Sequence, residues 1–383
     1  MPGPAHWIAT FEWVQRERII AVTRPKIVQH SFGDPGTGGP IMSLQRVLDS
    51  ELASKYTFHR MHQNAALGGV DLDLLREWST NLRRLKPDLV HVRGLGNEGF
   101  HGVVAARLAS CPRILLSIHG TTRDLQFVER PARRRVLTGI VEPCTLRLAT
   151  HIVTVCNSGS KRDFLKNYSA KFAGVLPNGV ELPDVARPMR SRVRRELGLR
   201  QEQMALVVVG RLSVEKGHLI LAQALREPRI NLRQAALILV GDGPDRSVIE
   251  AAYRSVDNLA FYPLGRRMDV AEILQACDAF VFPTLHENLS NALLEAMAAG
   301  LPVVASAVGG NVEVLDRGGG ILVPASSPGA LADALARLLA DPSLRHTYGV
   351  QARGVIAERY TTAHMIDKLD RIYTSILRGG TVE

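Results

Sequence analysis

Short apolar segments alternate with helix-like segments along most of this chain, and this alternation limits the folds that it can adopt. The first apolar segments are KIVQHSF (26–32), PDLVHVRG (87–94), ILLSIHG (114–120), HIVTVCNS (151–158) and FAGVLPNGV (172–180). Each has the length of a buried strand, and helical stretches separate them. The pattern predicts βαβ units and a parallel, doubly wound α/β sheet.

The alternation restarts after residues 184–203, which are polar, basic and without a strand pattern. The second series is ALVVVG (205–210), AALILVG (235–241), LAFYPLG (259–265), AFVFP (279–283), PVVAS (302–306) and GILVP (320–324). A chain of 383 residues also exceeds one ordinary core, so two domains are expected. Ligands of open parallel sheets bind beyond the carboxyl ends of the strands, so two facing sheets would form a cleft between the domains.

We therefore predict two similar Rossmann-like halves joined by a linker. The predicted ranges are an N-terminal extension (1–25), an N-terminal domain (26–183), a linker (184–203), a C-terminal domain (204–360) and a final segment (361–383). The extension contains Trp7, Phe11 and Trp13. It is compatible either with a short amphipathic helix or with translation from a misplaced start codon.

Composition narrows the class of protein. Hydrophobic residues make up 46% and charged residues 22%, as in soluble globular proteins. The sequence has no apolar run of membrane-spanning length and no signal-peptide order at its start, so we expect a cytoplasmic protein. Its four cysteines are scattered without CxxC spacing, which predicts reduced, buried thiols.

The charge of the chain is uneven. The formal net charge is +10, and residues 1–185 hold 24 Lys or Arg against 16 Asp or Glu. A basic half suggests anionic partners, although a solvated surface without a partner would give the same charge distribution. The densest cluster, Arg130 with Arg133–Arg135, could meet an anionic membrane surface peripherally or form a solvated helix face. Nucleic acid is not expected, because aromatic residues make up only 5%.

The stretch PTLHENLSNALLEAMAAGLPVVAS (283–306) places Glu287 and Glu295 eight positions apart. Pro283 ends the preceding strand, Ser290 or Asn288 suits a helix N-cap, and Gly300 suits a helix stop. The stretch therefore predicts a corner, with Glu287 in the loop and Glu295 in the helix. The amides of residues 288–290 would lie at a helix N-terminus, where anions bind. The helix dipole alone would explain Glu295 but not Glu287.

A second motif, VVVGRLSVEKG (207–217), places Arg211 and Lys216 after a strand that ends at Gly210. A guanidinium and an ammonium together suit a diphosphate and could stabilise its charge as it departs. The alternative is two solvated surface cations. The motif lacks the GxxxxGK[ST] pattern of a P-loop.

Two glycine-rich loops could approach a phosphate but do not indicate a nicotinamide cofactor. Gly38 and Gly39 belong to GTGGP, and Gly241 and Gly243 follow a strand. Neither loop completes the dinucleotide-binding fingerprint.

His119 is expected at the carboxyl end of a buried strand, where it could contact a sugar hydroxyl or move a proton. A structural histidine is the alternative. Asp71 and Asp73 superficially match a metal-binding DxD, but they open a helix, where acidic residues are favoured. No His, Cys or carboxylate cluster has ligand spacing, so no metal is expected.

These motifs together resemble those of retaining glycosyltransferases of family 4, which have the GT-B fold. The resemblance rests on VVVGRLSVEKG, VGDGP, HENLSNALLEAMAAGLPVVAS and GGNVEVLDRGGGILVP, and more loosely on GTGGP, PDLVHVRG, SIHGTTRD and LPNGV. It covers residues 26–377 and implies two Rossmann-like, doubly wound parallel-sheet domains facing across a cleft. It also implies that the final helix crosses back to the N-terminal domain.

The resemblance implies a role for each site residue. We expect Glu287 and His119 to contact the donor sugar and Glu295 to hold the ribose. Arg211 and Lys216 are expected to bind the diphosphate. The remaining residues are expected near the sugar and diphosphate (Asn288, Leu289 and Ser290) or along the donor site (Gly38, Gly39, Gly210 and Gly241). Asn288 departs from the family pattern, in which a glycine is common at this place. That departure bears on which sugar is accepted.

The implied activity is transfer of a hexose or N-acetylhexosamine from a nucleotide-diphosphate sugar, a UDP- or GDP-sugar, without metal or cofactor. The acceptor would be a hydroxyl of a glycan, a lipid-linked molecule or a small molecule. A nucleotide-sugar epimerase or hydrolase on the same fold is one alternative. A non-catalytic sugar-nucleotide-binding protein is another.

Overall fold

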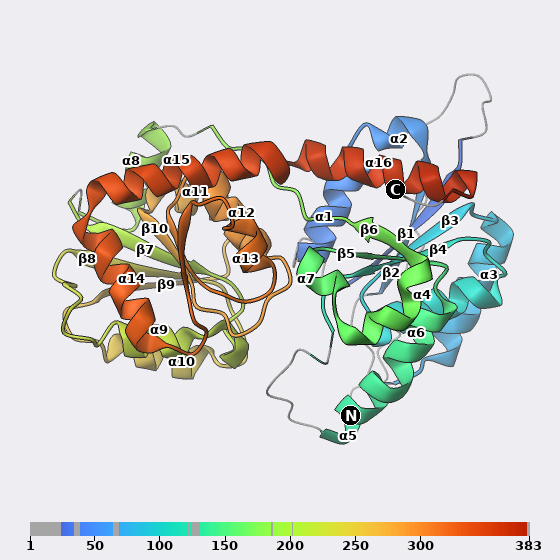
Figure 1. Ribbon diagram of the computed structural model, residues 1–383, viewed down its shortest axis with the longest axis horizontal. Helices are drawn as coiled ribbons and strands as arrows, with labels where there is room; N and C mark the ends of the chain where they lie inside the picture. The colour runs from blue at the N-terminus through green and yellow to red at the C-terminus, as the bar shows by residue number, and fades with distance from the viewer. Residues whose placement is uncertain are drawn as a thin grey trace, which may run out of the picture. The chain divides into compact units, whose positions relative to one another are not determined.

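The computed structural model describes residues 24–33, 39–63, 69–121, 123, 131–184, 187–200 and 202–380. The chain divides into two compact units (Figure 1). Unit 1 is Met1–Pro177 together with Met365–Glu383, and unit 2 is Asn178–His364. Each unit is a six-stranded parallel sheet with flanking helices, which confirms the predicted α/β class.

The sheet of unit 1 has the order β2-β1-β3-β4-β5-β6. Its strands are β1 (Lys26–Phe32), β2 (Thr57–Gln63), β3 (Leu89–Arg93), β4 (Ile114–Ile118), β5 (His151–Thr154) and β6 (Phe172–Val175). All neighbours pair in parallel, as βαβ connections require.

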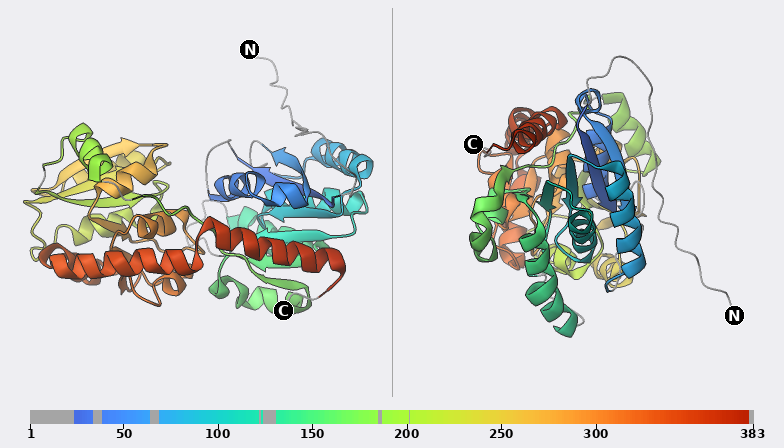
Figure 2. Two further views of the ribbon diagram at one scale, coloured as in Figure 1. Left: turned by 90° about the horizontal axis from the view of Figure 1, so that it is seen from above. Right: turned by 90° about the vertical axis from the view of Figure 1, so that its right-hand side faces the viewer.

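Helices cover both faces of this sheet (Figure 2). They are α1 (Gly39–Leu48), α2 (Leu52–Lys55), α3 (Leu72–Leu85), α4 (Asn97–Leu108), α5 (Pro131–Val136), the π-helix η2 (Leu137–Val141), α6 (Glu142–Leu148), α7 (Asn157–Ser160), the 3₁₀ helix η3 (Asp163–Lys171) and α16 (Thr362–Arg378). One face packs on α3 and α4 around the buried Trp78. The other face packs on α16, which supplies Leu369 and Tyr373 to its core.

The sheet of unit 2 has the order β12-β11-β10-β7-β8-β9. Its strands are β7 (Met204–Val209), β8 (Ala235–Val240), β9 (Ala260–Gly265), β10 (Ala279–Phe282), β11 (Val303–Ser306) and β12 (Gly320–Val323). Its helices are α8 (Arg187–Glu196), the 3₁₀ helix η4 (Val214–Lys216), α9 (His218–Ala224), α10 (Arg246–Arg254), α11 (Val270–Ala276), α12 (Asn291–Ala298), α13 (Gly310–Val314), α14 (Pro328–Ala340) and α15 (Pro342–Arg359). Every residue of β8 is buried, as expected for a strand covered on both faces.

The segment that we predicted as a linker, 184–203, contains helix α8. Val193 and Arg194 of this helix are buried, and Arg194 donates to the carbonyl oxygen of Ala276 at 3.1 Å. These contacts belong to unit 2, so part of that basic segment packs into a domain. A mostly basic helix is easily mistaken for a linker when its helical periodicity is not recognised.

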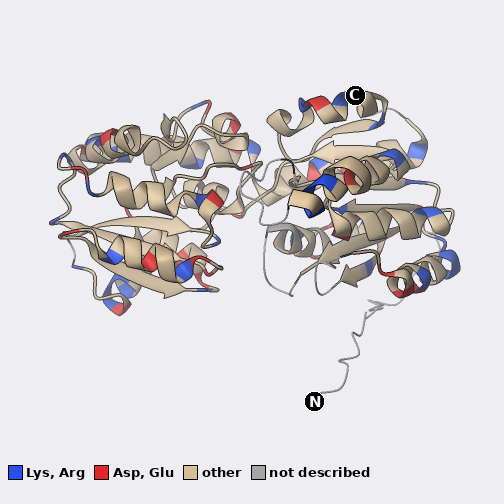
Figure 3. Cartoon of the chain, turned by 90° about the horizontal axis from the view of Figure 1, so that it is seen from below, with Lys and Arg blue, Asp and Glu red and all other residues tan. Residues whose placement is uncertain are grey.

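Charged residues lie mostly on helices and loops, and the strands carry few of them (Figure 3). No helix in the described part of the chain is both long and apolar enough to cross a membrane. The predicted extension, residues 1–25, lies outside the described residues except for its last two positions.

Candidate functional site

The corner predicted for 283–306 is confirmed. Strand β10 ends at Phe282, and α12 begins at Asn291. Ser290 is the N-cap, because its Oγ accepts a hydrogen bond from the Leu293 amide at 3.3 Å. Gly300 has φ +77°, which favours glycine after the helix end. Glu287 therefore lies in the loop and Glu295 inside the helix, as expected.

The two motifs of unit 2 meet at one ion pair. Lys216 Nζ lies 2.7 Å from Glu287 Oε2, and both side chains are mostly buried, with 23% and 16% of their areas exposed. The ammonium also lies 5.6 Å from the centre of the Phe282 ring. This contact joins the two sequence motifs at the carboxyl edge of the sheet, where ligands of such folds bind.

Backbone contacts fix Lys216 beside the β10 loop. Gly217 has φ +69°, and a Cβ atom there would lie 1.9 Å from the carbonyl oxygen of Pro283. The Leu285 amide donates to the carbonyl oxygen of Glu215 at 2.8 Å. Only glycine satisfies this close approach, so the EKG sequence brings its lysine to Glu287.

The glycines predicted near the donor lie next to each other. Gly210 follows β7 and Gly241 follows β8. Gly241 has φ +143°, and a Cβ atom on it would lie 1.8 Å from the carbonyl oxygen of Gly210. Arg211 follows Gly210 and is exposed, so its guanidinium is accessible to a ligand.

The loop residues directly after Glu287 are buried. Asn288 and Leu289 are buried, with 8% and 7% exposed, and the Asn288 amide donates to Glu287 Oε1 at 3.3 Å. The amides of Leu289 and Ser290 precede the N-terminus of the eight-residue α12. The arrangement can present backbone N–H donors to an anion. Glu295 lies in α12, one turn after its first residue.

Two residues that support this loop were not predicted. Gly309 has φ +47°, and a Cβ atom there would lie 1.8 Å from the carbonyl oxygen of Glu287. Asn178 donates from Nδ2 to the carbonyl oxygen of Leu289 at 3.1 Å. The paired glycines 309–310 after strand β11 were the signal for the first, and the sequence offered no comparable signal for the second.

In unit 1, His119 follows β4 directly, as predicted. Its Nε2 is buried and has no hydrogen-bond partner among the described residues. Burial, with a contribution from the positive charge of Arg93, lowers the pKa of His119 to about 3. The imidazole is therefore neutral near pH 7 and can donate or accept one hydrogen bond at Nε2.

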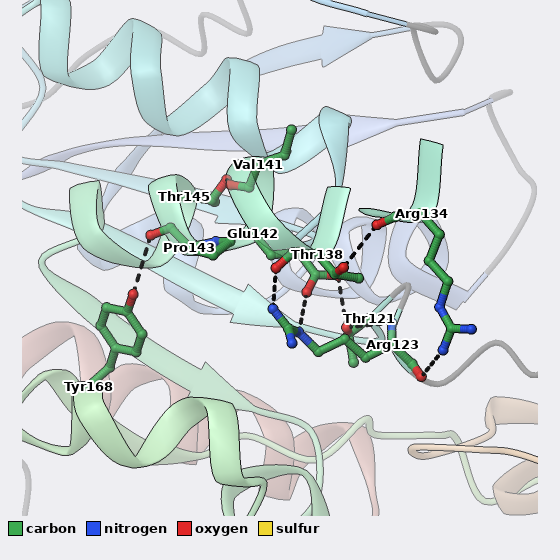
Figure 4. A network of polar contacts seen from close by, with 9 residues as sticks. All are labelled: Thr121, Arg123, Arg134, Thr138, Val141, Glu142, Pro143, Thr145 and Tyr168. Carbon is green, nitrogen blue, oxygen red and sulfur yellow. Dashed lines mark hydrogen bonds and ion pairs between the residues drawn. The ribbon is translucent and has the colours of Figure 1, made fainter. Parts of the chain in front are cut away.

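A polar network fixes the segment that follows His119 (Figure 4). Glu142 is fully buried, and its carboxylate accepts from Thr121 Oγ1 at 2.8 Å and from Arg123 Nε at 2.7 Å. Arg123 also donates to the carbonyl oxygen of Thr138. Thr138 belongs to the π-helix η2, an element that is frequent at functional sites. No motif in the sequence predicted this network.

Other predicted features fall outside what the structure describes or stay untested. Gly38 lies outside the described residues, and Gly39 is the first residue of α1. Arg130 is also outside, whereas Arg133–Arg135 lie in α5, which has no buried residue. Within the described residues, no group of three His, Cys, Asp or Glu side chains is placed to hold a metal ion.

Comparison with known sequences assigns the family. Profiles described as "Glycosyltransferase Family 4" and "Glycosyl transferases group 1" match residues 49–183 and 203–341. The chain is 31% identical to the alpha-maltose-1-phosphate synthase of Mycolicibacterium smegmatis over 73% of this chain and 76% of that one. It is 28% identical to a UDP-Gal:alpha-D-GlcNAc-diphosphoundecaprenol alpha-1,3-galactosyltransferase of Escherichia coli, over 77% of each.

Solved structures agree on the fold. HepE from Anabaena, in complex with UDP-glucose, superposes with a TM-score of 0.75 at 18% identity, covering 91% of this chain and 99% of HepE. A sucrose-phosphate synthase from Thermosynechococcus elongatus gives a TM-score of 0.73 at 19% identity, covering 93% and 100%. The chain thus belongs to glycosyltransferase family 4 and has the GT-B fold.

Proposed function

We propose that this glycosyltransferase moves a hexose or N-acetylhexosamine from a nucleotide-diphosphate sugar to an acceptor hydroxyl, with retention of anomeric configuration and without a metal ion. The acceptor class is a glycan, a lipid-linked molecule or a small molecule. The observation that carries the proposal is the 2.7 Å contact between Lys216 and Glu287, directly before the N-terminus of α12.

The arrangement suits a diphosphate leaving group. Without a donor, Lys216 is neutralised by Glu287. A bound diphosphate gives Lys216 and the exposed Arg211 a second anion, and their charges stabilise the negative charge that grows on the departing phosphate. Two side-chain cations can supply the charge that a metal supplies elsewhere. Glu287, freed in part from Lys216, accepts hydrogen bonds from sugar hydroxyls, and Glu295 accepts from the ribose.

The donor is a UDP- or GDP-sugar in this proposal, and a UDP-sugar is favoured. The name of the Escherichia coli relative specifies UDP-Gal, and HepE was solved with UDP-glucose. Asn288 stands beside the sugar position with 8% of its area exposed. Its side chain reduces the space there compared with glycine.

Retention follows a front-face path in this proposal. The bond from the anomeric carbon to the phosphate oxygen breaks, the bond to the acceptor oxygen forms on the same face, and the acceptor proton passes to the leaving phosphate. Glu287 is an unsuitable covalent nucleophile in this proposal, because its carboxylate accepts hydrogen bonds from the Asn288 amide and from the sugar hydroxyls. A covalent glycosyl adduct on Glu287 would contradict this path.

The test is incubation with UDP- and GDP-sugars and a panel of glycoside, lipid-linked and aminocyclitol acceptors, with chelator present. The proposal predicts that a product forms only when an acceptor is present. The NMR coupling constants of that product should show the same anomeric configuration as the donor. Release or epimerisation of the sugar without acceptor would favour the hydrolase or epimerase. Donor binding without turnover across the panel would favour the non-catalytic alternative.

A further inference from the structure

The face of the unit 1 sheet that packs on α16 changes in character along the strands. Because strand side chains alternate, every second residue points to this face. Counted along each strand, the first residues on this face are apolar and fully buried, namely Ile27, Leu89 and Leu115. The next on each strand are polar and buried, namely Gln29, His91 and Ser117. Ser31, Arg93 and His119 follow towards the carboxyl edge, where the register places Ser117 beside Arg93 and His119 one step beyond it.

The middle row is hydrogen-bonded to its own members and to α16. Gln29 Nε2 donates to the hydroxyl of Tyr373 at 2.8 Å, although Gln29 Oε1 has no partner among the described residues. The same hydroxyl lies 2.6 Å from His91 Nδ1, and His91 Nε2 lies 2.6 Å from Ser117 Oγ. These hydrogen bonds attach the middle row to α16, and none of its members carries a charge.

The row at the carboxyl edge is not satisfied in the same way. Arg93 has 3% of its area exposed, and its guanidinium donates from Nη1 to the carbonyl oxygen of His30 at 3.0 Å. Within the described residues no carboxylate pairs with Arg93, and the positive charge is not balanced by one. His119 Nε2 is buried beside it without a hydrogen-bond partner in that part of the chain.

The charge on Arg93 persists at neutral pH. Burial lowers its pKa to about 10, so the guanidinium stays protonated. Burial lowers the pKa of both His30 and His119 to about 3, so neither adds charge. A buried cation without a counter-ion is unfavourable, and proteins normally pair such groups. An arginine fork matches the two oxygens of a phosphate or carboxylate.

We propose that Arg93 binds an oxyanion, a phosphate or a carboxylate, that a substrate carries to the carboxyl edge of the unit 1 sheet. This rests on the proposed function, since a glycosyl-transfer site must admit two substrates. The oxyanion has two sources, a charged group of the acceptor or the diphosphate of the donor. Either would supply the counter-charge that Arg93 lacks among the described residues.

Counter-ions from stretches that the structure does not describe have to be tested, and Asp34 is taken first because it follows β1 so closely. Asp34 lies three positions after Ser31, in the stretch 34–38 that the structure does not describe. If Asp34 paired with Arg93, neutralising either residue would leave a buried charge alone and lower the melting temperature. The proposal predicts instead that, in the absence of ligand, Arg93→Met does not lower the melting temperature, because the substitution removes an uncompensated cation.

The experiment follows melting temperature against inorganic phosphate, with chloride added to keep ionic strength constant. The parent chain carries Arg211→Gln and Lys216→Met, so that the cations proposed for the donor do not contribute. Phosphate is expected to raise the melting temperature of this parent. Adding Arg93→Met should abolish the rise, Arg93→Lys should keep a smaller rise, and the exposed control Arg84→Gln should keep all of it.

Three results would overturn the proposal. The first is a phosphate response that persists in Arg93→Met. The second is a loss of melting temperature without phosphate in both Arg93→Met and Asp34→Asn, which would make Asp34 the counter-ion. The third is failure of Arg93→Met to fold while Arg93→Lys folds and ignores phosphate, which would make the arginine structural.

Affinity for UDP identifies the source and tests the proposed function separately. In the otherwise wild-type chain, a tenfold or larger loss of UDP affinity in Arg93→Met assigns the oxyanion to the donor diphosphate. Unchanged UDP affinity assigns it to the acceptor. If UDP does not bind the wild-type chain, the proposed donor site fails, whatever the phosphate result at Arg93.

Discussion

Lys216 has two partners in this account, Glu287 without donor and the diphosphate with donor. Lys216→Met removes one of the cations proposed to stabilise the leaving group, and one such interaction is worth about 100- to 1,000-fold in kcat. We predict a fall of that size, measured by steady-state transfer. The control Lys166→Met removes an exposed lysine that pairs with Asp163 in unit 1. A kcat for Lys216→Met within about threefold of wild type would contradict the assigned role.

Buried histidines make stability depend on pH. His218 has 1% of its area exposed, and burial lowers its pKa to about 4, whereas an unfolded histidine has a pKa of about 6.5. Below pH 6.5 the unfolded chain binds a proton that the folded chain does not. The free energy of unfolding therefore falls as pH drops from 6.5 towards 4, by up to about 1.4 kcal/mol per pH unit for this residue.

Urea unfolding at pH 7 and pH 5.5 tests this linkage. His218→Gln should lose less stability between the two pH values than wild type, by about 1 kcal/mol. The exposed control His346→Gln should lose as much as wild type. Equal losses in His218→Gln and wild type would show that the folded protein binds a proton at His218 over this range.

At the scale of elements, the loop between β10 and α12 depends on a neighbouring turn. A Cβ atom on Gly309 would lie 1.8 Å from the carbonyl oxygen of Glu287, and φ is +47°. Gly309→Ala must therefore shift the loop or the turn. We predict at least a tenfold weaker binding of the donor nucleotide, measured by calorimetry, because a small displacement moves the amides and Glu287 together.

Gly198→Ala is the matched control for this substitution. Gly198 also has a positive φ, +68°, but a Cβ atom there meets nothing within 4 Å. It carries the same kind of backbone strain, about 1 kcal/mol, without the collision. Nucleotide affinity should be unchanged in Gly198→Ala. If both variants bind equally well, the Gly309 turn does not position the loop.

The elements also show what sequence can predict. The alternation of strands and helices, the β10–α12 corner and its Ser290 cap followed from periodicity and capping rules, because those signals are local. Strand β2, TFHRMHQ, was not predicted, because it is largely polar. Helix α8 was missed, because a mostly basic helix resembles a linker in composition. Asn178 and the Glu142 network depend on contacts between distant segments, which no local pattern specifies.

At the scale of the whole molecule, unit 1 is completed by the end of the chain. Helix α16 buries Met365, Ile366, Leu369, Ile372, Tyr373 and Ile376 against the unit 1 sheet. Burial of an apolar side chain contributes about 1.5–3 kcal/mol, so the helix contributes on the order of 10 kcal/mol, comparable to the stability of a domain. Ending the chain after His364 should therefore unfold unit 1.

Limited proteolysis with mass spectrometry measures this effect. In the chain ended after His364, fragments from 24–177 should disappear first, while 178–364 persists. A chain ended after Gly380 keeps α16 and should resist protease like the full chain. Equal protection of unit 1 in both truncated chains would show that α16 is dispensable to its core.

The central claim is that unit 2 binds a nucleotide-diphosphate sugar through residues of two motifs. The most direct test is a thermal-shift panel of UDP-, GDP-, ADP- and dTDP-sugars with chelator, on wild type, Glu295→Ala and the exposed control Glu202→Ala. A ligand at 100 times its dissociation constant stabilises by about 2.7 kcal/mol. We predict that one nucleotide class, UDP first, stabilises wild type and Glu202→Ala but not Glu295→Ala. Stabilisation of Glu295→Ala equal to wild type, or of none of the three chains by any donor, would contradict the claim.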